Sequence, residues 1–308
     1  MNKKTVYKIK GLYRDDFRVT GYEFGSGKRS VCIVGPCRGN EMQQLYVCSQ
    51  LVKKFKQLEE EKRIKKGCKV LIIPTMNSYS YNIQKRFWST DGTDINRMFP
   101  GYDEGETTQR IADGVFREVS KYDIGIQFTS FYMPGEFMPH IRMMKTENCD
   151  VEMAKQFGLP YVVLKNIQPF DTTTLNYNWQ VWDKQAFSFY TTTTKRIDRA
   201  SAGMAILSIL SFLAQQGIVK YQGPMGVESE VIEDTDLVTV QTARSGLFEG
   251  LVNVGDEVKI GTPIANIVDP YDGDIVETLY APCDCRIFFE HSDPLTYANT
   301  VVFKLVRI

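Results

Sequence analysis

Two short polar segments of the sequence carry side chains whose types and spacing could do chemistry. The first, Gly35 to Glu41, lies between an apolar run and a stretch with helical spacing, so we expect it where a buried strand turns into a helix. Within it, Cys37 and Glu41 stand four residues apart. A thiolate and a carboxylate can both bind zinc, and a zinc hydrolase needs three protein ligands and an open position for water. The structural alternative makes Cys37 a small buried residue and Glu41 a carboxylate favoured by the helix dipole.

The second segment, Asp91 to Gly101, predicts a rigid loop that presents a cation. Asp91-Gly92 is a turn signal, and the adjacent pair Asn96-Arg97 precedes Phe-Pro-Gly at 99–101. A guanidinium held in such a loop can clamp a carboxylate through two parallel hydrogen bonds. The structural alternative, to which we give equal weight, is that Arg97 makes only a surface salt bridge.

Apolar runs that alternate with amphipathic stretches must position these two segments. Short apolar runs predict buried strands, and apolar residues three or four apart predict helices with one buried face. The predicted strands are 31–34, 69–73, 123–128, 161–164 and 187–190, and the predicted helices are 40–61, 107–121 and 201–216. Such alternation indicates a sheet covered on both faces, with ligands bound at the carboxyl ends of its strands, near Gly35, Asn77 and Phe128.

The pattern of predicted secondary structure changes near Gly223. From Val238 onward, short β runs alternate with glycine turns, and no long helical stripe follows. We therefore predict an α/β fold over residues 1–222, with a mixed, mostly parallel central sheet and helices on both faces. Residues 223–308 are predicted to form a small all-β domain.

Composition narrows the choice of partner and compartment. Lysine plus arginine and aspartate plus glutamate each number 37, so the formal charge is zero and no global field favours nucleic acid or an anionic membrane. A small-molecule carboxylate ligand is the more natural partner, and the sequence leaves a homo-oligomer open. Seven scattered cysteines without a CxxC pair favour a reducing, cytoplasmic compartment. The longest apolar segment, 202–214, is too short to span a bilayer.

Several motifs together resemble the succinylglutamate desuccinylase/aspartoacylase family, which has a zinc carboxypeptidase-like fold. The most specific is Asp-Gly-x-Asp-x-Asn-Arg-x-Phe-Pro-Gly at 91–101. The others are 35–41, 123–128 and 139–142 and, in the C-terminal part, 245–248, 254–258, 261–264 and 281–285. The likeness covers nearly the whole chain. The C-terminal part also resembles biotinyl and lipoyl barrel-sandwich modules, but it lacks their Met-Lys hairpin.

The resemblance implies a zinc site, and three of its four catalytic positions differ here. The family signature Gly-x-His-Gly-x-Glu binds zinc through its His and Glu, and we place the His position at Cys37, with Glu41 retained. The second zinc histidine corresponds to Gln127, a weak and neutral ligand. Tyr190, or else Thr191, occupies the position of the general-base glutamate. The implied metal ligands are therefore Cys37, Glu41 and Gln127, a set uncommon for zinc.

The substrate-binding side of the family site is better retained. Arg86, Asn96 and Arg97 match family positions around the substrate pocket, and His140 with Arg142 fits a second polar contact. A retained clamp beside altered metal ligands favours a protein that still binds a carboxylate-bearing acylated amino acid, or a related small molecule, on a deacylase scaffold.

Three functions follow from these residues. The favoured one is ligand binding with weak or lost hydrolysis. The second is an active zinc hydrolase that cleaves an amide or ester bond with Cys37, Glu41 and Gln127 as altered ligands. The third is nucleophilic chemistry by the Cys37 thiol, because a helix N-terminus lowers a thiol pKa, with His140 as the candidate base.

Overall fold

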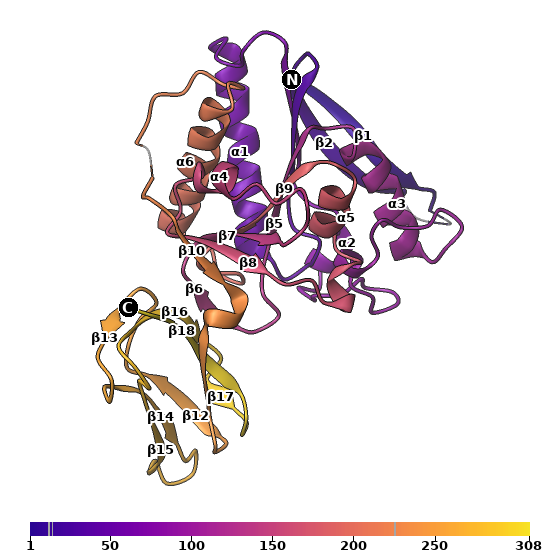
Figure 1. Cartoon of the computed structure of the whole chain (residues 1–308). Coiled ribbons are helices and arrows are strands. Elements are labelled where there is room, and N and C mark those ends of the chain that lie inside the picture. The colour runs from indigo at the N-terminus through magenta and orange to yellow at the C-terminus, as the bar shows by residue number, and fades with distance from the viewer. Residues whose placement is uncertain (12, 14, 225) are drawn as a thin grey trace.

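A nine-stranded mixed sheet forms the centre of the larger part of the protein (Figure 1). The structure is a computed structural model and describes residues 1–11, 13, 15–224 and 226–308. In spatial order, the strands are β1 (Asn2–Ile9), β2 (Phe17–Gly25), β4 (Cys68–Ile73), β3 (Arg29–Val34), β5 (Ile124–Thr129), β9 (Gln185–Tyr190), β7 (His140–Met144), β8 (Tyr161–Lys165) and β10 (Glu230–Glu233). The pairs β1/β2, β2/β4 and β7/β9 are antiparallel and the remaining pairs are parallel. The predicted mixed, mostly parallel sheet is confirmed.

Helices cover both faces of this sheet, as predicted (Figure 1). Helices α1 (Met42–Glu60) and α6 (Arg199–Gln215) pack on one face, and α3 (Thr107–Val119) and α5 (Leu175–Val181) pack on the other. Strand β3 sends Val31 and Ile33 into the first core and Cys32 and Val34 into the second. Because successive side chains of a strand point to opposite faces, burial on both sides produces the continuous apolar run seen in the sequence.

Shorter helical turns complete the larger part. They are α2 (Ser78–Tyr81), α4 (Val151–Lys155), and the 3₁₀ turns η1 (Ile95–Arg97), η2 (Pro169–Asp171) and η3 (Asp234–Asp236). None of the helices in the described part of the chain combines the length and the apolar character that crossing a bilayer requires.

The C-terminal part consists of two further sheets, which confirms its predicted all-β character. One sheet contains β11 (Val238–Gln241), β18 (Val301–Arg307), β16 (Cys285–His291) and β13 (Glu257–Val258). The other contains β15 (Ile275–Tyr280), β14 (Pro263–Val268), β12 (Gly246–Gly250) and β17 (Leu295–Thr296). Their inner faces share one apolar core that includes Ile264, Leu279, Ile287 and Phe303. The likeness to a barrel-sandwich module stays a prediction.

The two parts are joined by strand pairing as well as by the chain. Strand β6 (Gly135–Phe137) leaves the larger part and pairs with β16, while β10, which follows residue 223, pairs with β8 of the central sheet. A small core at this junction contains Phe137, Tyr161, Phe288 and Phe289. The domain division at 222/223 stays a prediction. These contacts hold β18 close to β7 and β8, so that side chains of all three strands line one pocket.

Candidate functional site

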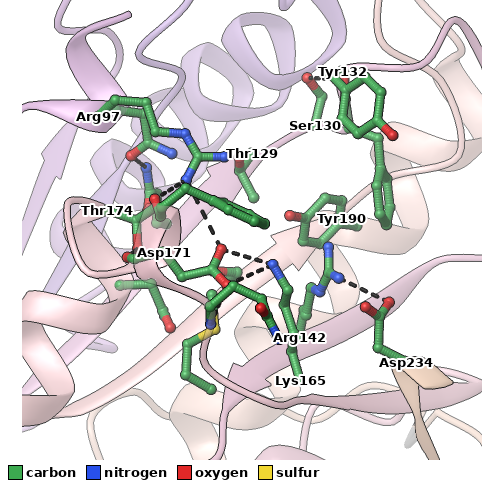
Figure 2. Close-up of a pocket in the computed structure, with 18 of the residues that line it drawn as sticks. Arg97, Thr129, Ser130, Tyr132, Arg142, Lys165, Asp171, Thr174, Tyr190 and Asp234 are labelled. Carbon is green, nitrogen blue, oxygen red and sulfur yellow. Dashed lines mark hydrogen bonds and ion pairs between the residues drawn. The ribbon is translucent and has the colours of Figure 1, made fainter.

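A polar cavity of about 310 Å³ lies over the end of β5 and the neighbouring strands β9, β7 and β8 (Figure 2). Its size suits a small molecule. Six cationic side chains line it: Arg38, Arg86, Arg97, Arg142, Lys165 and Lys304. The acidic lining residues are Asp171 and Asp234. The pocket is therefore strongly biased toward anions, although the chain as a whole is neutral.

The first predicted segment forms the turn between β3 and α1. Its backbone passes so close to α2 that a Cβ at Gly39 would lie 2.4 Å from the carbonyl carbon of Ser80, so only glycine fits there. Glu41 occupies the N-cap position of α1 rather than the helix interior. The turn points the side chains of Cys37, Arg38 and Glu41 into the protein, and all three are buried.

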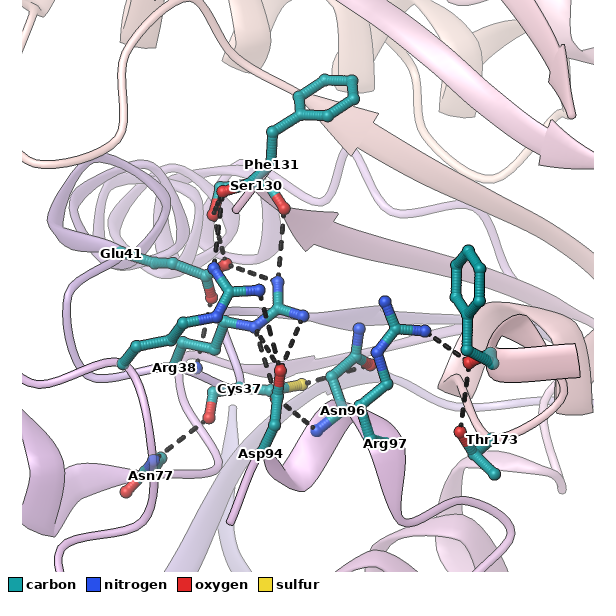
Figure 3. Close-up of polar contacts among 12 residues, drawn as sticks. Cys37, Arg38, Glu41, Asn77, Asp94, Asn96, Arg97, Ser130, Phe131 and Thr173 are labelled. Carbon is teal, nitrogen blue, oxygen red and sulfur yellow. Dashed lines mark hydrogen bonds and ion pairs between the residues drawn. The ribbon is translucent and has the colours of Figure 1, made fainter. Parts of the chain in front are cut away.

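Arg38 is the centre of the polar network at this end of the pocket (Figure 3). Its Nε lies 3.0 Å from Asp94 Oδ2, and its Nη1 lies 3.3 Å from Glu41 Oε1 and 3.2 Å from the carbonyl oxygen of Ser130. The Ser130 hydroxyl also donates to Glu41, at 2.6 Å. Burial alone would lower the pKa of Arg38, but Glu41 and Asp94 outweigh it and raise the pKa, so the guanidinium stays charged. A permanent cation thus lies against the carboxylate expected to bind metal.

Cys37 and Gln127 contact each other beside this network. Gln127 Nε2 donates to Asn96 Oδ1 at 2.8 Å and lies 3.4 Å from Cys37 Sγ. Burial, aided by the Glu41 charge, holds the pKa of the Cys37 thiol well above its ordinary value. The thiol therefore stays protonated at neutral pH. That state disfavours the nucleophilic chemistry considered for this residue.

The contacts favour Arg38, rather than Cys37, as the counterpart of the family histidine. In Gly-x-His-Gly-x-Glu the His precedes the Glu by three residues, and Arg38 is three residues before Glu41. Arg38 also makes the i,i+3 ion pair with Glu41, whereas Cys37 lies toward Asn96. The sequence comparison placed the His position one residue too early because it anchored the motif at Gly35.

The donor chemistry of these residues does not fit a zinc ion. Zinc needs lone pairs from thiolate, neutral imidazole or carboxylate. Here the Gln127 amide presents its N–H groups toward Asn96 and Cys37, and the Arg38 guanidinium is bound to Glu41. Within residues 1–11, 13, 15–224 and 226–308, no cluster of three His, Cys, Asp or Glu side chains has a metal-binding arrangement.

The predicted carboxylate clamp lies at the pocket wall next to Arg38. Arg97 is held by the Phe170 carbonyl oxygen, 2.5 Å from its Nη1, and by Asp171 at 3.9 Å, yet a third of its side chain stays exposed. Arg86 contacts Asp94 at 3.7 Å and the Phe131 carbonyl oxygen at 3.5 Å. With Asn96, both arginines line the pocket, so the structure brings these three predicted residues together.

Arg142 and Tyr190 line the same pocket, whereas His140 lies behind it. Arg142 donates to Asp234 Oδ1 at 2.8 Å. The ring of His140 is fully buried, stacks on Tyr190 at 4.6 Å and contacts the Met138 carbonyl oxygen at 2.8 Å through Nδ1. His140 does not contact Cys37 among the described residues and is not part of the pocket lining. Its role in the structure is to support Tyr190.

The buried His140 predicts a loss of stability at mildly acidic pH. Burial lowers the pKa of His140 from 6.5 to about 3. Between these values the unfolded chain binds the proton and the folded chain does not, so stability falls as the pH drops below about 6.5, by roughly 1.4 kcal/mol per pH unit. His140→Phe keeps the stacking and removes the titration. We expect urea unfolding to show about 2 kcal/mol less destabilisation between pH 6.5 and pH 5 in this variant than in the parent. An equal loss in both proteins would contradict this role.

Several pocket residues were not found from the sequence. Lys165 follows the predicted strand 161–164 directly, so its place at a strand end was a usable signal. Arg38 lies inside the first segment, where the length of the signature could have identified it. Asp171, Asp234 and Lys304 carry no local pattern, because tertiary packing alone brings them to the pocket.

Comparison with known proteins places this site in a family. Residues 27–199 match the family model of the succinylglutamate desuccinylase/aspartoacylase catalytic domain. Over 262 residues the chain is 24% identical to N-alpha-acetyl-L-2,4-diaminobutyric acid deacetylase of Halomonas elongata. The aligned region covers 82% of this chain and 73% of that protein.

Solved structures show the same fold. A succinylglutamate desuccinylase from Silicibacter sp. TM1040 superposes with a TM-score of 0.81 at 18% identity, covering 98% of this chain and 92% of that one. The product-bound ectoine utilization protein EutE (DoeB) from Ruegeria pomeroyi gives a TM-score of 0.80 at 19% identity, covering 95% and 90%. Since the family model spans more than half of the sequence and includes both predicted segments, the chain belongs to the succinylglutamate desuccinylase/aspartoacylase family.

Proposed function

We propose that this protein binds a small carboxylate-bearing ligand, such as an acylated amino acid, on a deacylase scaffold whose hydrolytic step is weak or lost. The observation that carries the proposal is the Arg38 guanidinium bound to Glu41 and Asp94. Members of the family are N-acyl amino acid deacylases and generally depend on zinc. Here a side-chain cation of fixed charge supplies the positive charge that a metal would bring to Glu41.

A guanidinium can balance a carboxylate, but it cannot activate water as zinc does. It has no open coordination position, and it does not lower the pKa of a bound water toward neutrality. Of the residues expected to hold zinc, Glu41 is bound by Arg38 and Ser130, and Gln127 contacts Cys37 and Asn96. This is why we assign the charge balance of the site to Arg38 and route no chemical step through a metal.

Among the described residues that line the pocket, no carboxylate is free to act as the base in a proton-transfer step. The lining carboxylates, Asp171 and Asp234, are each paired with a cation, at 2.7 Å and 2.8 Å. Tyr190 takes the general-base position of the sequence comparison, and Ser188, which pairs with Gln127 across the sheet, is equally neutral. Loss of a positioned base typically costs about 10²–10⁴ in rate. The missing base and the altered ligands are therefore both expected to lower the rate of hydrolysis.

Ligand binding is supported by the clamp that remains. Arg97 keeps an exposed guanidinium edge while its other contacts fix its position, and Arg86 adds a second cation nearby. A carboxylate bound by such a fork forms charge-assisted hydrogen bonds, the strongest type available to a small ligand. The amide Oδ1 of Asn96 is already used by Gln127, so Asn96 would offer its N–H groups to the ligand.

Nα-acetyl-L-glutamate tests the proposal, with binding measured by calorimetry, hydrolysis by NMR and zinc by elemental analysis of the purified protein. We expect binding without hydrolysis and without stoichiometric zinc. Hydrolysis that requires about one zinc per chain and is abolished by Cys37→Ala would contradict the proposal and establish the zinc hydrolase with altered ligands.

The clamp predicts a specific loss of affinity. Arg97→Met removes the guanidinium but keeps an apolar stem of similar length, and it should weaken Nα-acetyl-L-glutamate binding at least tenfold, as expected for the loss of a charge-assisted pair. Arg117→Met is the matched control, because Arg117 is an exposed arginine that pairs with carboxylates and does not line the pocket. Equal affinity of the two variants for the ligand would contradict a role of Arg97 in binding it.

A further inference from the structure

We propose that Cys283 and Cys285 form a redox-sensitive modification site, at which a peroxide oxidises the two thiols to a reversible disulfide within the chain. Both residues lie in the C-terminal part, and neither lines the polar cavity. The inference is therefore independent of the proposed function. The name "thiol pair" is used below for these two residues.

The two thiols of the pair contact each other directly. The Cys285 thiol is hydrogen-bonded to the Cys283 side chain. Along a fully extended chain, two residues this far apart have Cα atoms about 6.6 Å apart, close to the upper limit at which a disulfide closes. Here the chain bends at residues 282–284, which shortens that separation. A bond between the two sulfur atoms therefore requires little movement of the backbone.

Contacts on both sides hold the thiol pair in place. Asp284, between the two cysteines, accepts the Ile260 N–H at 2.9 Å through its carboxylate and the Ile308 N–H at 3.3 Å through its carbonyl oxygen. Cys285 begins β16 and has strand partners on β13 and β18, beside the C-terminus (Figure 1). A second thiol fixed next to the first has a high effective concentration, so closure of the disulfide is favoured over reaction with another molecule.

The two thiols differ in exposure. Cys285 is fully buried in the core of the C-terminal part, whereas Cys283 packs against that core and stays partly exposed. Burial, together with the charge and the hydrogen bond of Cys283, raises the pKa of Cys285 to about 11. The deeper thiol therefore keeps its proton at neutral pH. The accessible sulfur of Cys283 is the one that meets an oxidant from solvent.

The reaction with hydrogen peroxide takes two steps. The Cys283 thiolate attacks one peroxide oxygen, the O–O bond breaks, and the other oxygen leaves as water after taking up a proton. Cys283 is then a sulfenic acid. The Cys285 sulfur attacks the Cys283 sulfur, the S–O bond breaks, and the hydroxyl leaves as water with the Cys285 proton. The two thiols lose two electrons in total, and the peroxide is reduced to two waters.

The disulfide of the thiol pair should be easy to reduce. With one residue between the cysteines, the ring that closes is small and strained, and it constrains the unfolded chain little. Strained disulfides accept electrons readily, so reduced glutathione should restore both thiols. Such a bond is compatible with the reducing compartment predicted from the scattered cysteines, where disulfides are transient.

Mass spectrometry of the full chain tests the thiol pair. The folded protein is treated with hydrogen peroxide, denatured, alkylated with iodoacetamide and digested with trypsin, which releases both cysteines in the single peptide 260–286. We expect this peptide to carry no alkyl group and to weigh two hydrogens less than the reduced peptide. Prior incubation with millimolar reduced glutathione should return it to the doubly alkylated form. Double alkylation after peroxide alone, or an irreversible sulfinic acid at Cys283, would overturn the proposal.

Substitutions assign the order of the two steps. In Cys283→Ser, the remaining Cys285 thiol should be lost to peroxide at least tenfold more slowly than in the parent, since its accessible partner is gone. In Cys285→Ser, dimedone should trap a sulfenic acid at Cys283. Cys149→Ser is the control, because Cys149 is a partly exposed cysteine of the larger part, and its disulfide formation should match the parent. If Cys285 is oxidised as fast in Cys283→Ser as in the parent, the assignment is wrong, and this result does not depend on the folding of the Cys285 variant.

Discussion

Replacing Arg38 with methionine is expected to lower the free energy of unfolding by about 3–5 kcal/mol, the largest single-residue effect on stability that we expect in the site. Arg38 is 3% exposed, and its guanidinium binds Glu41, Asp94 and the Ser130 carbonyl oxygen. Methionine fills a similar volume but leaves the buried Glu41 without a counter-charge and Asp94 with only the more distant Arg86, at 3.7 Å. The cost arises chiefly from these weakened or lost charge pairs. Urea unfolding at neutral pH measures it.

Arg117→Met provides the comparison for this experiment. Arg117 also bridges two carboxylates, Asp103 and Asp113, but 64% of its side chain is exposed. Solvent screens such pairs, so the change should stay below about 1 kcal/mol. Similar losses in both variants would mean that burial does not decide the effect, and Arg38 could then not be regarded as the internal cation of the site.

The dependence of the site on Arg38 explains why the altered ligands coexist in a folded protein. A metal-binding carboxylate that loses its metal becomes a buried, unpaired charge. Arg38 removes that cost for Glu41 and also engages Asp94, which in turn holds the loop of Asn96 through its backbone N–H at 3.0 Å. The cation therefore connects Glu41 to the loop that carries Asn96 and Arg97. On the proposed function, it preserves the geometry of binding without the chemistry of hydrolysis.

Much of the fold was predictable because burial on both faces of a sheet leaves an unmistakable apolar run. The predicted strand 31–34 corresponds to β3 (Arg29–Val34), and the predicted helix 201–216 corresponds to α6 (Arg199–Gln215). Strand β7 was missed, because its sequence places Arg142 among apolar residues and the arginine faces the pocket. Helix α5 was missed since it buries polar residues such as Asn176 and Gln180 rather than an apolar stripe.

The residues of the candidate site could be predicted where they lie close together in the sequence, within one motif. Asn96 and Arg97 share one loop and were identified together with Arg86 from the family pattern. Lys304 could not be found in this way, since only the pairing of β6 with β16 and of β10 with β8 brings β18 to the pocket. His140 was misjudged because its burial depends on Tyr190 and Phe288, which are distant in the sequence.

Restoring the family ligands should create a zinc site, provided that Arg38 is one of the residues changed. The double variant Arg38→His/Gln127→His places two imidazoles beside Glu41, a His₂Glu set that zinc favours. It also removes the cation that opposes a metal ion. We expect about one zinc per chain after dialysis, measured by elemental analysis, and a rise in thermal stability on adding zinc, because a ligand that binds only the folded state stabilises it.

Cys37→His/Gln127→His is the decisive comparison, because it introduces the same two imidazoles and keeps Arg38. In that variant the guanidinium still holds Glu41, so zinc should not bind at stoichiometric levels. If both double variants bind zinc equally, Arg38 does not block the site, and the proposed loss of the metal needs another cause. If the Arg38→His/Gln127→His variant binds zinc but still fails to hydrolyse Nα-acetyl-L-glutamate, the missing base at Tyr190 and Ser188 becomes the second, independent reason for the absence of catalysis.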